Sequence, residues 1–192
     1  MEKNWYEKFR WFFTSSGLLV IGGKSAEQNE EVVRNRIENN DLVLHTATPG
    51  SPFAVIKSEK CKITTQDVKE AAIFCASFSQ QWKKGKRTAE IHVFSPNQIK
   101  KERGEKEGTF SVAGKIEKIN AELRLFIDIQ EGKIRAVPEN AAKKKDIEIT
   151  PGKMSKEEAS KKIREILKEN KIDFSEIQIM QALPAGSFKI IK

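Results

Sequence analysis

Hydrophobic residues recur along the chain at two spacings, one typical of strands and one typical of helices. The aromatic-rich run Phe9–Thr14 and the apolar run Leu18–Ile21 flank Ser15-Ser16-Gly17, and this pattern predicts a β-hairpin. Alternating or short apolar runs predict further strands at Leu42–Thr46, Phe53–Ile56, Ala89–Phe94 and Thr109–Ala113.

Two helices are predicted among these strands, each beginning at a side chain that can cap it. Ser25 with Gln28 three residues later forms a capping-box pattern and begins a helix that ends near Glu38. Thr64 with Asp67 begins a second helix, which we expect to end at Lys83-Lys84-Gly85. The apolar side of this second helix consists of Val68, Ala71, Ala72, Cys75, Ser79 and Trp82.

The chain after residue 115 has its own strands and helices. Ser155 with Glu158 marks the beginning of its main helix. The predicted elements are strands at Leu123–Asp128, at Lys133–Val137 and around Ile147 and Ile149 (ending at Pro151-Gly152), helices at Ser155–Asn170 and Phe174–Ala182, and a strand at Phe188–Ile191. We therefore predict an α+β fold. A mixed or antiparallel sheet with two main helices forms domain 1–115, and a smaller α+β domain follows at 116–192.

Composition narrows the classes of function. The 192 residues include 32% charged residues, carry a formal net charge of +8 and have a pI of about 9.4. The periodic apolar runs exclude wholesale disorder. A basic surface attracts the phosphate backbone of a nucleic acid, and it also attracts anionic membranes and acidic proteins. Both predicted domains are rich in Lys and Arg, so charge alone does not assign a partner to either.

Cysteine usage and hydropathy place the protein in the cytoplasm. Cys61 and Cys75 stand alone and form neither a disulfide framework nor a metal motif. No apolar run reaches the roughly 18 residues that a membrane span needs. The first residues, Met1–Asn4, have no signal-peptide character. We expect no membrane association, no cofactor and no bound metal.

Enzymatic motifs are absent from the sequence. The two histidines, His45 and His92, lie far apart, and no nucleophile elbow, phosphate-binding Walker loop or zinc signature occurs. We therefore expect a protein that is not an enzyme.

Three segments contain residues suited to binding an anion. Gly22-Gly23-Lys24 precedes a capped helix, and it is either an anion site or a tight turn between a strand and a helix. The loop after His45 exposes Thr48, Gly50 and Ser51, whose polar groups can donate to phosphate or ribose oxygens, although a structural turn beside a packed histidine explains the pattern as well.

The third segment is the run Trp82-Lys83-Lys84-Gly85-Lys86-Arg87. Its four cations suit a polyanion, whereas Trp82 is expected in the core. The run Lys100–Glu107 mixes both signs of charge, and we expect a solvated loop there.

The same segments together resemble a known family. The matching stretches are Phe9-Arg10-Trp11-Phe12 with Ser16–Lys24, Gln28-Asn29-Glu30, Asp41–His45 followed by Pro49-Gly50-Ser51, Ala76–Ser79 with Trp82-Lys83, Val93–Gln98, and Gly108-Thr109-Phe110 with Gly114-Lys115. In this order they resemble the NFACT-R domain, formerly a domain of unknown function, of the ribosome quality-control factors that include RqcH and NEMF. The resemblance covers about residues 4–115.

The resemblance implies binding to structured RNA, either tRNA or rRNA of the large ribosomal subunit. It transfers to Lys24, Asn29, His45, Gly50 and Ser51. The other modules of the large family members are not present in this sequence. We expect electrostatic docking on phosphates, with hydrogen bonds from the loop that begins at His45. The cations assigned to docking are Lys24, Arg34, Lys57, Lys83, Lys84, Lys86 and Arg87.

Two alternative functions remain open at this point. The protein could be an enzyme or accessory subunit of tRNA modification, in which His45 acts with Ser51 or Cys61. It could also be a protein-interaction module on a ribosome-associated complex, which would use the aromatic cluster Phe9, Trp11, Phe12 and Phe13, although core packing explains these aromatic residues better.

Overall fold

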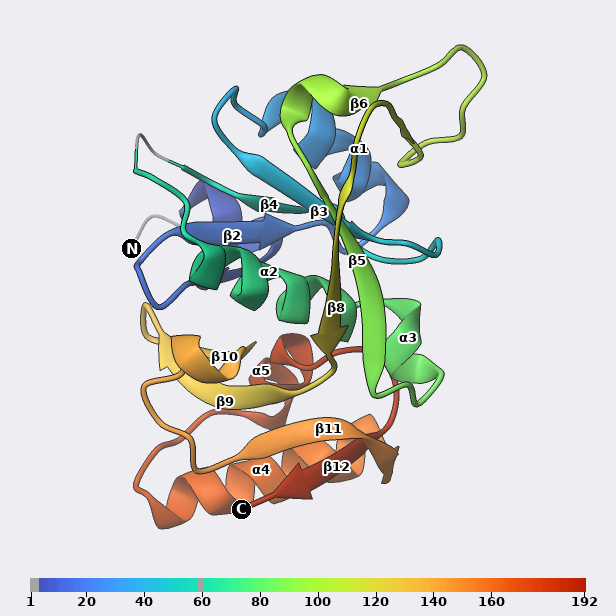
Figure 1. The fold of residues 1–192 in the computed structure, drawn as a ribbon. Coiled ribbons are helices and arrows are strands. Elements are labelled where there is room, and N and C mark those ends of the chain that lie inside the picture. The colour runs from blue at the N-terminus through green and yellow to red at the C-terminus, as the bar shows by residue number, and fades with distance from the viewer. Residues whose placement is uncertain (1–3, 59–60) are drawn as a thin grey trace.

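A computed structural model describes residues 4–58 and 61–192, and the start of the chain, where we expected no signal peptide, lies partly outside this range. The fold is α+β, as predicted (Figure 1). The helices are α1 (Ala26–Asn35), α2 (Thr65–Ser77), α3 (Gln80–Lys83), α4 (Lys156–Glu169) and α5 (Glu176–Ala182), with short 3-10 turns at Trp5–Lys8, Pro96–Gln98 and Glu139–Ala141. None of the described helices is long and apolar enough to cross a membrane.

The strands form one large sheet, one smaller sheet and a short ribbon, and all pairings between described strands are antiparallel. The large sheet has the order β1 (Arg10–Phe13), β2 (Leu19–Gly22), β4 (Ala54–Ile56), β3 (Leu42–Thr46), β5 (Thr88–Phe94) and β8 (Glu117–Glu122). The smaller sheet has the order β10 (Lys133–Val137), β9 (Leu125–Gln130), β11 (Glu148–Met154) and β12 (Phe188–Ile191). The ribbon pairs β6 (Ile99–Lys100) with β7 (Ser111–Val112).

Both faces of the large sheet are buried, because its strands direct consecutive apolar side chains to opposite sides. Val20 and Leu44 belong to the core on the α2 side, whereas Ile21 and Val43 belong to a second core that includes Val32 of α1. Helix α2 therefore lies between the two sheets, and α1 covers the opposite face of the large sheet (Figure 1).

Local sequence signals account for the helix starts. The capping boxes predicted at Thr64 and Ser155 are both present. Ser25 caps α1 by accepting from the Gln28 amide, but the Gln28 side chain accepts from the backbone N–H of Lys24 rather than from that of Ser25. Helix α1 ends at Asn35, three residues earlier than expected.

The second predicted helix is two helices, and this difference matters for the site. The helix α2 ends at Ser77, and Ser79 caps the separate helix α3 by accepting from the Gln81 amide. The Ser79 hydroxyl also donates to the carbonyl of Ala76 at 2.6 Å. A Ser side chain that bonds the local backbone competes with helix continuation, so the apolar spacing alone concealed the break.

Two further differences concern strands. The segment Glu117–Glu122 was not predicted as a strand, yet as β8 it pairs with β5 at the edge of the large sheet. The strand β11 does not end at Pro151-Gly152 but continues to Met154 through a register shift opposite Phe188, and such a bulge accommodates a proline within a sheet. The boundary at residue 115 remains a prediction, with β8 following it and completing the first sheet.

Side-chain hydrogen bonds connect the first and second parts of the chain. The Gln130 amide of β9 accepts from the backbone N–H of Phe13 at 2.7 Å and donates to its carbonyl at 2.9 Å. The Trp82 indole N–H donates to the carbonyl of Ser187 at 3.0 Å, and its ring is fully buried, as predicted for a core residue. Gln130 therefore satisfies the N–H and C=O of one residue on the edge strand β1 and links β9 of the smaller sheet to it.

Removing the Gln130 clamp should weaken the whole molecule. We expect Gln130→Ala to lower the free energy of unfolding by about 2 kcal/mol, because it removes two hydrogen bonds and leaves a part-buried backbone pair unsatisfied. Glu122→Ala, on an exposed position of β8, should change it by less than about 0.5 kcal/mol. Urea denaturation of both variants measures the difference, and equal stabilities would contradict the assigned role of Gln130.

Candidate nucleic-acid interface

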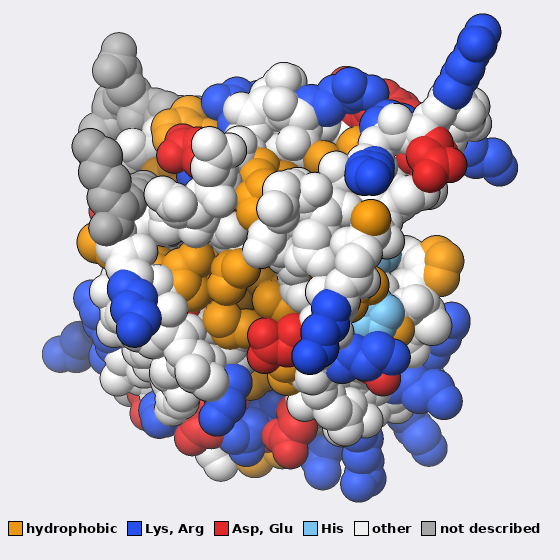
Figure 2. Space-filling model, turned by 45° about the horizontal axis from the view of Figure 1, so that its top comes forward, with side chains coloured by type: hydrophobic (Ala, Val, Ile, Leu, Met, Phe, Trp, Pro, Cys, Tyr) orange, Lys and Arg blue, Asp and Glu red, His pale blue; other side chains and the backbone are white. Residues whose placement is uncertain are grey.

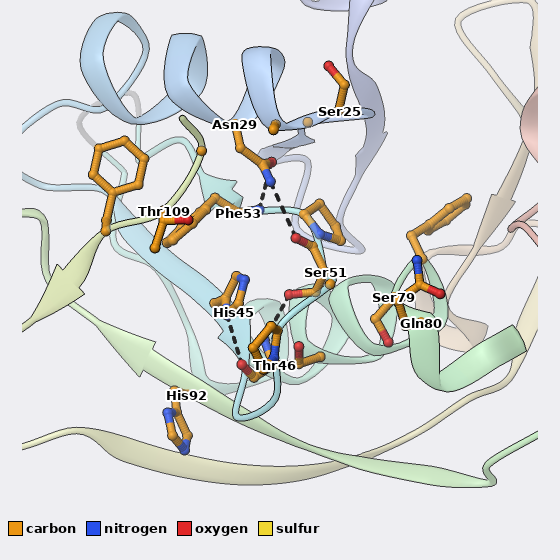
Figure 3. A pocket seen from close by; sticks show the side chains of 18 of the residues that line it. Ser25, Asn29, His45, Thr46, Ser51, Phe53, Ser79, Gln80, His92 and Thr109 are labelled. Carbon is orange, nitrogen blue, oxygen red and sulfur yellow. Dashed lines mark hydrogen bonds between the residues drawn. The ribbon is translucent and has the colours of Figure 1, made fainter. Parts of the chain in front are cut away.

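A groove of about 660 Å³ lies where the start of α1, the β3–β4 connection and α3 meet (Figure 3). Its walls include residues 23–26 and 49–53, and residues 107–110 close one side. The chain segments come from widely separated parts of the sequence, so only the folded structure brings them together.

The Asn29 side chain connects α1 to the β3–β4 connection. Its amide oxygen accepts from the backbone N–H of Phe53 at 3.1 Å, and its amide nitrogen donates to the carbonyl of Ser51 at 3.4 Å (Figure 3). A Cβ atom at Gly23 would lie 2.3 Å from the Asn29 amide oxygen. Gly23 is therefore required for space, which favours the interpretation of Gly22-Gly23-Lys24 as a close-packed turn.

Gly50 connects the same loop to α3. Its φ of +100° is in the region that favours glycine, and a Cβ atom would lie 2.5 Å from Cγ of Gln80. The carbonyl of Gly50 accepts from the backbone N–H of Gln80 at 2.8 Å, and Gln80 is the first residue of α3. Gly50 therefore allows the loop to approach the helix that carries Lys83.

Ser51 and Thr48 mainly stabilise this loop. The Ser51 hydroxyl accepts from the backbone N–H of Thr46 at 3.0 Å, and Ser51 is buried. The Thr48 hydroxyl accepts from the side-chain amide of Gln81 at 2.7 Å. The backbone carbonyl of Thr48 accepts from the hydroxyl of Thr46. Thr48 and Ser51 thus hold the backbone in place, while exposed groups of the same loop face the groove.

His45 lies in the wall of the groove with a defined tautomer. Its Nδ1 is 2.7 Å from the carbonyl oxygen of Thr46, and because a carbonyl only accepts, Nδ1 donates. Its ring packs on Phe53 at a centroid distance of 4.5 Å. Burial lowers the pKa of His45, and the electrostatic interaction with His92 acts in the same direction, against the raising effect of the Thr46 contact. At neutral pH Nε2 is therefore an acceptor, with no partner among the described residues.

The cations predicted to dock on phosphates are distributed unevenly around the groove. Lys24, just before α1, and Lys83, the last residue of α3, both line the groove. Lys84, Lys86 and Arg87 are exposed just beyond α3. On the face shown in Figure 2, histidine side chains reach the surface among Lys and Arg side chains.

Two other cations from the predicted set lie elsewhere. Arg34 is exposed on α1 but is not part of the groove, and its Nε donates to Glu30 at 2.6 Å. Lys57 is buried, and its Nζ donates to Asp41 at 2.5 Å and to the carbonyl of Arg36 at 2.7 Å. A lysine with these internal partners stabilises the fold, so we remove Lys57 from the docking surface.

The charged segment after β6 is a largely exposed loop, as expected, but it is also tied to α1. The Glu30 carboxylate accepts from Lys101 at 3.0 Å and from the backbone N–H of Gly108 at 2.8 Å. A hydrogen bond from Arg34, followed by that from Gly108, holds the pKa of Glu30 at about 2. The end of this loop is therefore fastened to α1, where it forms one side of the groove.

Several groove residues escaped the sequence analysis. Arg10, Gln80, His92 and Phe110 all line the groove. His92 is paired across the sheet with His45 and bonds Glu90 at 2.9 Å, and this pairing of β3 with β5 is not visible in the sequence. The one available signal was Arg10, a cation within an aromatic strand.

The geometry also bears on the two alternative functions. The Ser51 hydroxyl and the His45 Nδ1 both bond the Thr46 backbone rather than each other, and the exposed Cys61 has no described side-chain partner. Phe9, Trp11 and Phe12 are buried, and Phe13 is half-buried. The described residues therefore offer no bonded nucleophile–base pair with His45, and the aromatic cluster belongs to the core.

The chain is similar to several known proteins. The profile of the NFACT protein RNA binding domain matches residues 8–114. The archaeal Rqc2 homolog aRqcH of Methanocaldococcus jannaschii is 33% identical over 203 residues, which cover 100% of this chain and 30% of the relative. The human ribosome quality control complex subunit NEMF is 33% identical over 79 residues, 41% of this chain and 7% of that protein.

A solved structure shares the fold. The C-terminal part of the fibronectin/fibrinogen-binding protein from Streptococcus suis aligns with a TM-score of 0.53 and 18% sequence identity, covering 64% of this chain and 48% of that chain. This likeness supports the architecture alone.

The requirement for glycine at position 50 can be tested against a second glycine. We expect Gly50→Ala to destabilise the protein by about 1 kcal/mol more than Gly85→Ala, because both positions have positive φ but only Gly50 also faces a close neighbour. Thermal denaturation compares the two variants. Adding Gln80→Ala should recover the extra loss, and failure to recover it would contradict the contact with Gln80.

Proposed function

Because this chain belongs to the family of NFACT protein RNA binding domains, we propose that it binds structured RNA in the groove between α1, the β3–β4 connection and α3. The ligand in this proposal is a tRNA or an rRNA segment of the large ribosomal subunit. The observation that carries the proposal is that one groove is lined both by His45, whose Nε2 acceptor has no partner among the described residues, and by the cations Lys24 and Lys83.

Electrostatics supports docking of a phosphate backbone. Lys24 and Lys83 line the groove, and three further cations extend the positive surface past α3. Cations that neutralise phosphates release counterions, so they supply affinity without reading sequence. The surface therefore accounts for the docking part of the proposal.

Recognition of RNA over DNA requires a group that contacts the ribose or an unpaired base. The Nε2 atom of His45 accepts at neutral pH, and the ribose 2′-OH is a donor that DNA lacks. Phe53 and Phe110 pack edge to face beside His45, with centroids 5.5 Å apart, and fix the apolar wall at this point. We assign RNA selectivity to His45 on this basis.

We further propose that the protein acts in ribosome-associated quality control in the cytoplasm. The relatives are ribosome quality-control factors, and the chain spans less than a third of the length of the archaeal relative. In this proposal the chain docks RNA on a ribosome-bound complex. The other activities of such a complex come from the parts of those relatives that this chain does not match.

The electrostatic part of the proposal predicts a specific salt response. We expect the protein to bind tRNA more tightly than a DNA duplex of similar size at physiological salt. Replacing the four cations Lys83, Lys84, Lys86 and Arg87 with Ala should weaken tRNA binding by at least about tenfold and make the salt dependence shallower. A filter-binding or anisotropy titration across a salt series measures both quantities.

The control replaces Lys143, Lys144 and Lys145 with Ala. These exposed lysines lie in the second part of the chain, after residue 115, and do not line the groove. An equal loss in both variants would show only a general charge effect. Equal binding of tRNA and duplex DNA by the unmodified protein would contradict RNA recognition itself.

The hydrogen-bonding part predicts a separate effect at His45. His45→Phe retains packing on Phe53 but removes the acceptor, so we expect about tenfold weaker tRNA binding with DNA binding unchanged. Since the pKa of His45 is lowered from 6.5, Nε2 is protonated only as pH falls below that value. The ratio of tRNA to DNA affinity should therefore be constant from pH 8 to about 7 and fall in more acidic buffer. A ratio unaffected by His45→Phe would refute this role.

A further inference from the structure

A second, smaller cleft of about 310 Å³ lies between the two sheets. One wall is Arg10 and Trp11 of β1 with Phe78, and the opposite wall is Arg135 of β10 with Gln181 of α5. The two walls come from the two halves of the chain, so the cleft exists only when both halves are folded together.

Two arginines in this cleft lack an anionic partner. The guanidinium of Arg10 lies 4.8 Å from the ring centroid of Phe78, and that of Arg135 lies 4.1 Å from the ring centroid of Trp11. Neither arginine forms an ion pair with any described residue, and Nε of Arg135 is buried without an acceptor. A buried donor of this kind is costly unless a ligand or water satisfies it.

The cations of the cleft also repel one another. Burial lowers the pKa of Arg10 and of Arg135 to about 10. The pKa of Lys24 is lowered by burial and then by the charges of Arg10 and Arg135. Lys156 does not line the cleft, but its pKa is likewise lowered by burial and then by the charge of Arg10. The fold therefore brings Arg10, Arg135 and Lys24 together at one cleft, and an anion there would relieve the repulsion between them.

The nearby carboxylates compensate only part of this charge. Glu7 lines the cleft and raises the pKa of Arg135, but its carboxylate already accepts from Lys133. Glu157 acts in the same direction on Lys156, whose Nζ donates to the carbonyl of Leu183 at 3.1 Å. Neither carboxylate is bonded to Arg10 or Arg135.

We propose that this cleft binds one phosphate group of the RNA, held by the guanidinium groups of Arg10 and Arg135 with Lys24 at its mouth. Planar guanidinium donors match phosphate oxygens, and stacking on Phe78 and Trp11 fixes their orientation. Arg10 and Lys24 also line the groove described above, so an RNA strand in the groove can place an adjoining phosphate in the cleft. This inference rests on the proposed RNA-binding function for the identity of the ligand.

The test compares Arg135→Gln with Arg124→Gln in the full chain. Arg124 carries the same charge on the second unit, but it is paired with Glu139 outside the cleft. We expect Arg135→Gln to weaken tRNA binding about tenfold and to reduce the salt slope by about one, with Arg124→Gln close to the unmodified protein. Arg135→Lys, which retains the charge over Trp11 but not the planar donor pair, should show an intermediate loss and serves if Arg135→Gln does not fold.

Inorganic phosphate separates the cleft from the rest of the proposal. In phosphate compared with chloride at equal ionic strength, the melting temperature of the unmodified protein and of Arg124→Gln should rise more than that of Arg135→Gln. If the protein binds no tRNA but keeps this Arg135-dependent shift, the cleft is a site for a free phosphate and the proposed function fails. If phosphate raises the melting temperature of all variants equally and all of them bind tRNA equally well, the cleft is not a phosphate site. The proposed RNA-binding function would still hold in that case.

Discussion

The side-chain amide of Asn29 is the contact on which the proposed interface depends. It bonds both Ser51 and Phe53, and so fixes the β3–β4 connection against the start of α1. Gly23 leaves the space for that amide, and Gly50 lets the other side of the same connection meet α3. The groove between α1, the β3–β4 connection and α3 therefore depends on the Asn29 hydrogen bonds and on two glycines, Gly23 and Gly50, where a larger side chain would not fit. The clamp uses internal hydrogen bonds, which leaves the outward groups of the loop available to a ligand.

Much of the fold follows from local chemistry and was predictable. The strands β10 and β12 have the expected bounds, and Thr64 and Ser155 cap their helices as predicted, because alternation of apolar residues and capping side chains act over a few neighbouring residues. The family resemblance over the first part of the chain is confirmed by the match to residues 8–114. Packing of Trp82 in the core also followed from its position in an apolar pattern.

The features missed by the sequence analysis depend on tertiary contacts. The polar strand β8 has little alternation of its own and is stabilised by pairing with β5. In the sequence Lys57 cannot be distinguished from a surface lysine. In the structure it is buried and forms an ion pair with Asp41. Arg10 belongs to an aromatic strand that predicted only core packing, and its position in the walls of both the groove and the cleft depends on tertiary packing. Site residues of this kind emerge only when distant segments are assembled.

Binding in the groove is the central claim, and amide hydrogen exchange of the protein with and without tRNA tests it most directly. We predict slower exchange on tRNA binding in residues 23–29, 45–51 and 79–83, the three segments that meet at the groove. Residues 161–169 of helix α4 and residues 189–191 of strand β12, which line neither the groove nor the cleft, should exchange at unchanged rates. Protection confined to α4 and β12, with none in the three groove segments, would contradict the account.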